Sequence, residues 1–298
     1  MIGDNYIRHI GDIPAGWNIT SLAEWTCVKH CKYKGSAFQV DFSWSHNYQC
    51  DCRDVPFYHS FFIDHSVFWF LPCRDPLPLR RKYVIQIPLE EFACDWPDGC
   101  PSGCRCAYRP ANATFHVYCS AVNLPSLPLH VPPLPKSYDR CKLDFSKNKV
   151  LRRLEYRPYF VSTFLLDVSN CAIDVVDLNA WREFARLQSP FLTYAQVYLH
   201  GNDIVSVPLE VTGINFSSVQ IALNQNPWEC SCGNKWMIGW LKSLSFVFLN
   251  GADIMCASPA RLAGKSIIQS SAEDFCVDPA TRMLEISCRA RCQPLQSY

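Results

Sequence analysis

Four short apolar segments in the second half of the chain share one pattern of hydrophobic and polar positions. Each follows the form Leu-x-Leu-x-x-Asn-x-Ile, with apolar residues at alternate positions before the asparagine. Alternation with a period of two predicts a strand with one buried face. The segments begin at Leu143, Leu166, Val197 and Ile221, so their starts are 23, 31 and 24 residues apart. A period of roughly 20 to 29 residues predicts a solenoid of stacked repeats, with one longer member here.

The two faces of these predicted strands have different roles. Alternate apolar side chains should point inward, while the asparagine should bond to backbone groups where the chain leaves the strand. Cys171 occupies the asparagine position of the second copy, a replacement that this repeat accepts. The other strand residues should face solvent on a concave surface suited to binding, although each one alone is better explained as a solvated strand residue. These candidates are Lys142, Asp144, Asp167, Gln196, Tyr198, His200, Gln220 and Asn224. His200 adds the alternative of a pH-dependent contact.

Other segments follow different patterns. Apolar residues at helical spacing between Asp177 and Leu187 predict a helix on the convex side. The alternation from Phe38 to Trp44 predicts a strand, and the aromatic residues of 55–70 would seal the apolar end of an earlier solenoid. Because no apolar run has membrane-spanning length, we expect no membrane span in this sequence. The first residues lack the apolar core of a signal peptide, so we expect a truncated start.

Composition narrows the class of protein. Eighteen cysteines in 298 residues are too many for a reducing compartment and predict a disulfide-bonded extracellular chain. A zinc protein is the competing interpretation, but paired Cys-x-x-Cys knuckles are absent and Cys27-Val-Lys-His30-Cys31 stands alone. The net charge of +1 gives no reason to expect nucleic acid or an anionic membrane as a partner. No catalytic motif occurs, so we expect neither an enzyme nor a cofactor or metal.

The spacing of the cysteines carries a family resemblance. Cys100, Cys104 and Cys106 form a Cys-Pro-x-x-Cys-x-Cys motif, and Cys119 follows in Val-Tyr-Cys-Ser, which resembles the amino-terminal cap of extracellular leucine-rich repeat proteins. Two further groups resemble the carboxy-terminal cap of the same proteins. They are Cys50, Cys52, Cys73 and Cys94, then Cys230, Cys232, Cys256 and Cys276. A carboxy-terminal cap that runs directly into an amino-terminal cap is similar to the ectodomains of Toll and Toll-like receptors of the multiple-cysteine-cluster type.

This resemblance implies an α/β leucine-rich repeat solenoid, with short parallel strands on a concave face and disulfide-bonded cysteine-rich caps. It divides the chain into the end of a truncated first solenoid (1–48), a first carboxy-terminal cap (49–95), an amino-terminal cap (96–135), about four repeats (136–226), a second carboxy-terminal cap (227–277) and a stalk or tail (278–298). The caps of the family bond first to third and second to fourth cysteine. The implied pairs are Cys50 with Cys73, Cys52 with Cys94, Cys100 with Cys106, Cys104 with Cys119, Cys230 with Cys256, and Cys232 with Cys276.

Four of the remaining cysteines carry separate expectations. In the predicted register Cys141 lies beside Phe164, which puts Cys171 seven residues farther along, about 20 Å away and beyond the ~7 Å between Cα atoms that a disulfide tolerates. Both should therefore be buried thiols. Cys288 and Cys292 lie outside every cap, and we favour a local bond between them over a covalent homodimer, with free thiols least expected. The pairing of Cys27 and Cys31 stays open.

The function implied by the resemblance is that of the membrane-proximal extracellular module of a Toll-like receptor. Such a module binds a protein ligand, a Spätzle-like cytokine or a microbial product, and dimerises in innate immune or developmental signalling. The chain would be part of a plasma-membrane receptor, or secreted if the short form is real. A structural or adhesion protein of the extracellular matrix is the alternative. Three sequons predict a glycoprotein, with acceptors at Asn18, Asn112 and Asn215.

Overall fold

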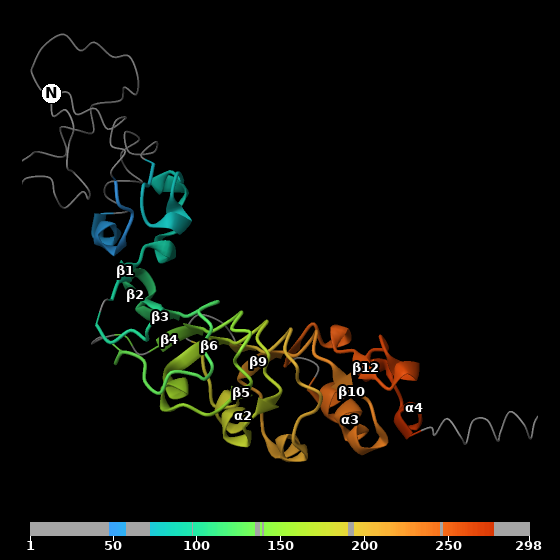
Figure 1. Cartoon of the computed structure of the whole chain (residues 1–298). Helices are drawn as coiled ribbons and strands as arrows, with labels where there is room; N and C mark the ends of the chain where they lie inside the picture. Colours follow the sequence, from blue (N-terminus) through green and yellow to red (C-terminus); the bar gives the residue numbers. More distant parts are fainter. Residues whose placement is uncertain are drawn as a thin grey trace, which may run out of the picture. The chain divides into compact units, whose positions relative to one another are not determined.

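The computed structural model describes residues 48–57, 72–96, 98–134, 138, 140–189, 194–244 and 247–276 (Figure 1). The chain divides into two compact units. The first contains 1–100, 105–116 and 134–139, and the second contains 101–104, 117–133 and 140–298. Several expectations lie outside the described residues: the strand at 38–44, most of the aromatic segment 55–70, Asn18, and the cysteines Cys27, Cys31, Cys288 and Cys292.

The second unit is built on a parallel sheet whose strands follow the repeats in order. The successive strands are β4 (Arg140–Asp144), β6 (Thr163–Asp167), β8 (Ala195–Tyr198), β9 (Val219–Ala222) and β11 (Phe248–Leu249), and each pairs in parallel with the next. β3 (Thr114–Tyr118) precedes β4 in the sheet order. The residues that begin the four sequence repeats all have no exposed surface. The leucine-rich repeat solenoid predicted from the sequence is confirmed.

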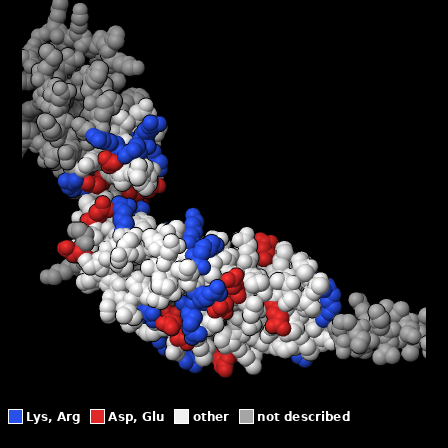
Figure 2. All heavy atoms as spheres, in the orientation of Figure 1, with Lys and Arg blue, Asp and Glu red and all other residues white. Residues whose placement is uncertain are grey.

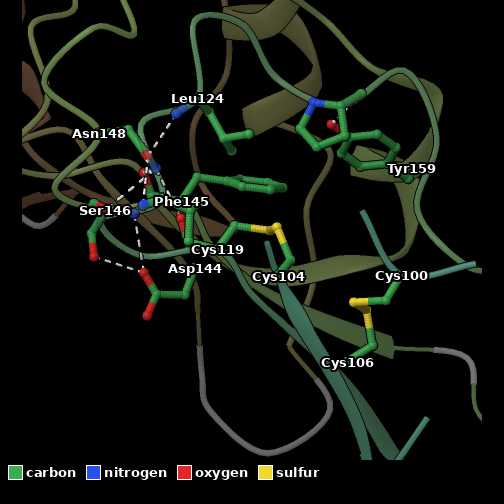
Figure 3. Close-up of a disulfide and its surroundings, with 12 residues drawn as sticks. Cys100, Cys104, Cys106, Cys119, Leu124, Asp144, Phe145, Ser146, Asn148 and Tyr159 are labelled. Atoms are coloured by element: carbon green, nitrogen blue, oxygen red, sulfur yellow. Dashed lines mark hydrogen bonds between the residues drawn. A yellow bond between two sulfur atoms is a disulfide. The ribbon is translucent and has the colours of Figure 1, made fainter. Parts of the chain in front are cut away.

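Side chains of the repeat asparagines connect neighbouring turns of the solenoid. The Asn148 Nδ2 atom donates to the carbonyl oxygens of Cys119 and Phe145 at 2.9 and 2.8 Å, and its Oδ1 accepts from the backbone amides of Val122 and Leu124 (Figure 3). Asn202 and Asn226 make the same kind of bonds two repeats and three repeats further on. Strand ends are thus held from one repeat to the next by buried amide groups.

The opposite side of the second unit is irregular and aromatic. It carries α2 (Leu178–Phe184), α3 (Trp236–Ser243), two 3-10 helices at Pro158–Ser162 and Leu209–Gly213, and the parallel pairs β5 (Arg153–Leu154) with β7 (Val175–Val176) and β10 (Trp228–Glu229) with β12 (Cys256–Ser258). In Figure 1, α2 and α3 lie on the side of the solenoid away from β6 and β9.

Aromatic rings from successive repeats form the core behind the sheet. Trp181 and Phe184 of α2 contact each other at 5.6 Å between ring centroids, and Trp181 reaches Phe216 of the next repeat at 6.3 Å. Phe216 in turn contacts Trp240 of α3. The helix predicted between Asp177 and Leu187 is present in shorter form, with the Asp177 side chain accepting from a backbone amide of its first turn.

Two details of the predicted register are wrong. Val150 is 49% exposed, and the neighbouring Leu151 is fully buried in the place that the pattern assigned to Val150. Cys141 lies opposite Thr163 rather than Phe164, because a β-bulge shifts the pairing between Cys141 and Lys142. Beyond the bulge, Leu143 pairs with Leu166, and both side chains are buried as predicted.

The described part of the first unit is held by short turns and disulfides. β1 (Cys94–Asp95) pairs antiparallel with β2 (Arg105–Arg109). Its 3-10 helices are Cys52–Phe57, Leu77–Leu79, Val84–Gln86, Leu89–Glu91 and Pro110–Asn112. In the second unit the last cap has 3-10 helices at Cys232–Asn234, Gly251–Asp253, Ala260–Leu262 and Ile267–Gln269, and then α4 (Ala272–Cys276). Across the described ranges, no helix combines the length and apolar character of a membrane span.

Candidate functional site

The parallel pairing aligns the candidate binding residues in rows across the concave face. Lys142, Leu165, Gln196 and Gln220 lie side by side in the first row. Asp144, Asp167, Tyr198 and Ala222 form the second row, one step along the strands. Backbone hydrogen bonds just past the strands align Ser146, Ser169, His200 and Asn224 as the third. All eight candidates predicted from the sequence lie in these rows and are partly exposed.

The two aspartates of the second row have a structural role as well as an exposed position. The Asp144 Oδ1 atom accepts from the Ser146 backbone amide at 3.1 Å and from its hydroxyl at 2.7 Å. Asp167 Oδ1 accepts from the Ser169 amide at 2.9 Å. These contacts fix the carboxylates at the ends of their strands. The second row therefore presents two adjacent negative charges in a defined geometry.

Tyr198 and His200 extend this polar face. The Tyr198 hydroxyl donates to Gln196 Oε1 at 2.9 Å, and its ring contacts the His200 ring edge-to-face at 6.0 Å. Burial raises the pKa of Tyr198 above its ordinary value, and the charge of Asp167 raises it further. The phenol is therefore neutral at physiological pH and acts as a hydrogen-bonding, partly apolar contact.

Two contributors to the face were missed by sequence analysis. Leu165 lies between Lys142 and Gln196 in the first row and is partly exposed. The alternation places Leu165 on this face, but the sequence search selected polar side chains there and so passed over an apolar one. Leu249 of β11 continues the second row beside Ala222. No repeat pattern marks β11, because it is two residues long and lies inside the second cap. The face is thus polar with apolar side chains interspersed, as at protein interfaces.

Disulfides close the caps at the ends of the repeats. The structure contains Cys50–Cys73, Cys52–Cys94, Cys100–Cys106, Cys104–Cys119, Cys230–Cys256 and Cys232–Cys276. These six pairs are the ones that the family resemblance implies. Cys104 and Cys119 lie directly beside the Asn148 network (Figure 3). Asp51, Cys52 and Cys94 bring three metal-ligand side chains together, but the bond between the two sulfur atoms removes both thiolates as ligands.

Cys141 and Cys171 are free and buried. Burial raises the pKa of each thiol from 9.0 to about 11, so both are protonated at physiological pH. The Cys171 thiol donates to the carbonyl oxygen of Phe145 at 3.4 Å, and the Asn148 amide donates to the same oxygen. Cys171 thus occupies the asparagine position, where its thiol is a weaker hydrogen-bond donor than the asparagine amide.

The glycosylation acceptors differ in their surroundings. Asn215 and Ser217 are both exposed, and Asn215 Oδ1 accepts from the Ser217 amide at 3.1 Å. Asn112 is half-buried, and its Oδ1 accepts from the hydroxyl of Thr114, which has no exposed surface. A glycan fits the folded surface best at Asn215.

Comparisons with known proteins support the same architecture. The model of the leucine rich repeat C-terminal domain matches residues 71–95 and 253–275, which lie inside the two segments expected as carboxy-terminal caps. SLIT and NTRK-like protein 5 of Homo sapiens is 38% identical over 58 residues, covering 20% of this chain and 6% of that protein. Chondroadherin of Homo sapiens is 31% identical over 91 residues, covering 30% of this chain and 23% of that protein.

Solved structures are similar over a longer stretch. A chain from the structure of the Drosophila Toll–Spatzle complex superposes with a TM-score of 0.59 at 21% identity, covering 77% of this chain and 30% of that chain. A glycosylated form of that complex gives a TM-score of 0.58 at 23% identity with the same coverage. The chain therefore spans less than a third of the length of these proteins. The fold and the cap match together identify the chain as a leucine-rich repeat solenoid closed by disulfide-bonded cysteine-rich caps.

Proposed function

We propose that the chain is a protein-binding module of an extracellular receptor of the Toll and Toll-like type, and that the concave face of the second unit contacts its ligand. The observation that carries this proposal is the alignment of partly exposed side chains in adjacent rows on a fixed parallel sheet. Side chains on rigid strands lose little freedom on binding, which favours their use for recognition.

The composition of the face supports a protein rather than a small molecule as the ligand. The first two rows combine charged, amide and aromatic side chains with Leu165 and Leu249. A Spätzle-like cytokine or a microbial product is the ligand class that we propose, with a second copy of the chain as partner in a homodimer. Binding rather than catalysis is the role that this surface favours. A matrix or adhesion role is the alternative, and it would use the same face without a soluble cytokine.

The direct test is a binding titration of the purified chain on an immobilised Spätzle-like cytokine. Gln196→Ala and Tyr198→Ala should each weaken binding by about tenfold if these side chains are central contacts. Arg182→Ala, an exposed change on α2 away from the sheet, should leave the affinity unchanged.

Two results would contradict the proposal. One is equal affinity of the wild type and both sheet variants, and the other is an absence of binding by a wild type that is shown to be folded. Circular dichroism and thermal unfolding of each variant must accompany the titration, because only variants that keep the wild-type fold are informative. Sedimentation of the chain over a range of concentrations tests the homodimer separately.

A further inference from the structure

The first carboxy-terminal cap contains a tight hairpin at residues 72–83, here called the first-cap hairpin. The Cys73 amide donates to the Lys82 carbonyl at 2.9 Å, and the Arg81 amide donates to the Cys73 carbonyl at 2.8 Å. The Cys50–Cys73 disulfide anchors its base. The backbone of the turn is therefore fixed at both strands.

The second cap contains the same hairpin at residues 255–266. The Cys256 amide donates to the Lys265 carbonyl at 2.9 Å, and the Gly264 amide donates to the Cys256 carbonyl at 2.9 Å. Cys256 is bonded to Cys230, as Cys73 is to its partner. When the two hairpins are matched by these hydrogen bonds, Gly264 corresponds to Arg81 of the first-cap hairpin.

This position requires a left-handed backbone. Gly264 has φ +78°, a conformation that glycine adopts at little cost. Arg81 has φ +68° at the equivalent position, where a side chain with a Cβ atom is strained. An arginine at a glycine position is unfavourable for the fold. Backbone strain of this kind concentrates at functional sites, and here it places a cation at the tip of the turn.

The residues around Arg81 are more basic than the matching residues of the second cap. Arg74 and Arg80 correspond to alanines in the second cap, and Lys82 corresponds to a lysine. The first-cap hairpin thus carries four cations and one carboxylate, Asp75, for a net charge of +3. Figure 2 shows Lys and Arg side chains gathered on the described part of the first unit.

The ion pairs that the hairpin makes, two within it and one with Glu91 outside it, leave its tip charged. Asp75 accepts from Arg80 at 3.2 Å and lies 3.8 Å from Arg74, while Lys82 lies 3.6 Å from Glu91. The Arg81 side chain is exposed and has no ion pair or hydrogen bond with any residue that the structure describes. Exposed pairs of this kind attract weakly, so the group retains a positive field.

The cations of the second hairpin are used differently. Arg261 donates to the backbone carbonyls of Asp274 and Phe275, and Lys265 pairs with the Asp274 carboxylate at 2.9 Å. These contacts join the hairpin to α4 of its own cap. The second hairpin therefore forms without an arginine at the position of Arg81, so folding of this motif does not require that side chain.

We propose that the first-cap hairpin binds a sulfated glycosaminoglycan chain, with Arg81 as its central contact. Six disulfides place the chain in an oxidising compartment, where sulfated polysaccharides are abundant linear polyanions. Guanidinium groups match tetrahedral oxyanions through paired N–H donors. A lipid surface fits less well, because anionic lipids are concentrated in the cytoplasmic leaflet.

The test uses the full chain and heparin as the probe. Arg81→Gly should weaken binding to immobilised heparin by about fivefold, since one charge-assisted contact is lost, and should lower the slope of log affinity against log salt by about 1. The same change should raise the thermal unfolding midpoint, because glycine relieves the left-handed strain. Loss of binding with gain of stability separates a ligand contact from a structural residue.

Lys147→Gly is the matched control. Lys147 is exposed, has φ +60° and lies in the repeats, so its replacement removes the same charge and relieves the same kind of strain elsewhere. It should bind heparin as the wild type does, and fully desulfated heparin should bind neither. If both variants lose the same heparin affinity, the effect comes from net charge and the proposed site is wrong. If the wild type binds phosphatidylserine vesicles but not heparin, the proposal of a glycosaminoglycan ligand is wrong.

Discussion

At the residue scale, a single buried asparagine joins two turns of the solenoid in three of the four repeats. Asn202 Nδ2 donates to the carbonyls of Val168 and Leu199 at 2.9 Å each, and its Oδ1 accepts from the Ile173 amide at 3.1 Å. Its side chain is 4% exposed, so water cannot replace these bonds. In the second repeat Cys171 makes the comparable connection with two long thiol bonds, to the carbonyl oxygens of Phe145 at 3.4 Å and Ser169 at 3.5 Å.

Asn202→Ala should therefore lower the free energy of unfolding by about 2–4 kcal/mol, because it leaves buried backbone groups without partners. Cys171→Ala is the control, with an expected loss of about 1 kcal/mol, since a thiol is a weak donor. Urea unfolding of both variants measures the difference. Equal losses would show that the asparagine contributes no more than a small apolar side chain at the same position.

The buried thiols give a pH dependence with a definite sign. The pKa of Cys141 and of Cys171 is about 11 in the folded chain against 9.0 for a free thiol. The unfolded chain therefore loses these protons first as pH rises. The stabilising effect of the protonated thiols is complete below about pH 9 and decreases as pH rises toward 11.

Labelling of Cys141 and Cys171 with a thiol reagent at pH 8 should accordingly be slow in the folded chain and fast after unfolding. The double variant Cys141→Ala with Cys171→Ala should also show a weaker loss of stability between pH 9 and pH 11 than the wild type. Rapid modification of Cys171 under native conditions would contradict its burial in the asparagine position.

At the element scale, the strands and caps could be predicted because their patterns are long or chemically distinctive. Four strands of the sheet and the helix near Trp181 follow from apolar spacing, and cysteine spacing locates the caps. The slip from Val150 to Leu151 could not be predicted, because two adjacent apolar residues satisfy the pattern equally well. The β-bulge at Cys141 shifts the pairing by one residue, and the alternation of apolar positions contains no sign of it.

The candidate site was predictable for a similar reason. Alternation alone assigned the eight partly exposed positions to one face, but it did not identify Leu165 or Leu249 as part of that face. The equivalence of Arg81 and Gly264 was also hidden, because it depends on matching hydrogen bonds rather than on similar residues. Backbone conformation at one turn residue is a property that spacing does not encode.

The cap disulfides allow a prediction for whole elements. The Cys232–Cys276 bond closes 44 residues and the Cys104–Cys119 bond closes 15, and both lie in the second unit. Loop entropy predicts losses of about 4 and about 3 kcal/mol when each pair is replaced by alanines. Denaturant unfolding of the two double variants gives the order. A larger loss for the shorter loop would show that packing at the amino-terminal cap outweighs chain entropy.

At the scale of the whole molecule, the solenoid separates two surfaces. The concave rows lie on the strands, whereas Asn215 is exposed in the connection between Leu209–Gly213 and β9. A glycan at Asn215 is compatible with a ligand on the rows, because the two positions belong to different parts of the repeat. The surface that we propose for recognition is therefore the one that should not tolerate a bulky modification.

A glycan placed on the concave face tests the central claim most directly. The pair Gln196→Asn with Tyr198→Thr creates an Asn-Val-Thr acceptor in β8, and Glu210→Asn creates one on an exposed 3-10 helix outside the sheet. Mass spectrometry must first confirm that both are occupied. Affinity for a Spätzle-like cytokine should fall by more than about tenfold with the concave glycan and stay unchanged with the other. Unchanged binding with a glycan on β8 would contradict recognition through the concave face.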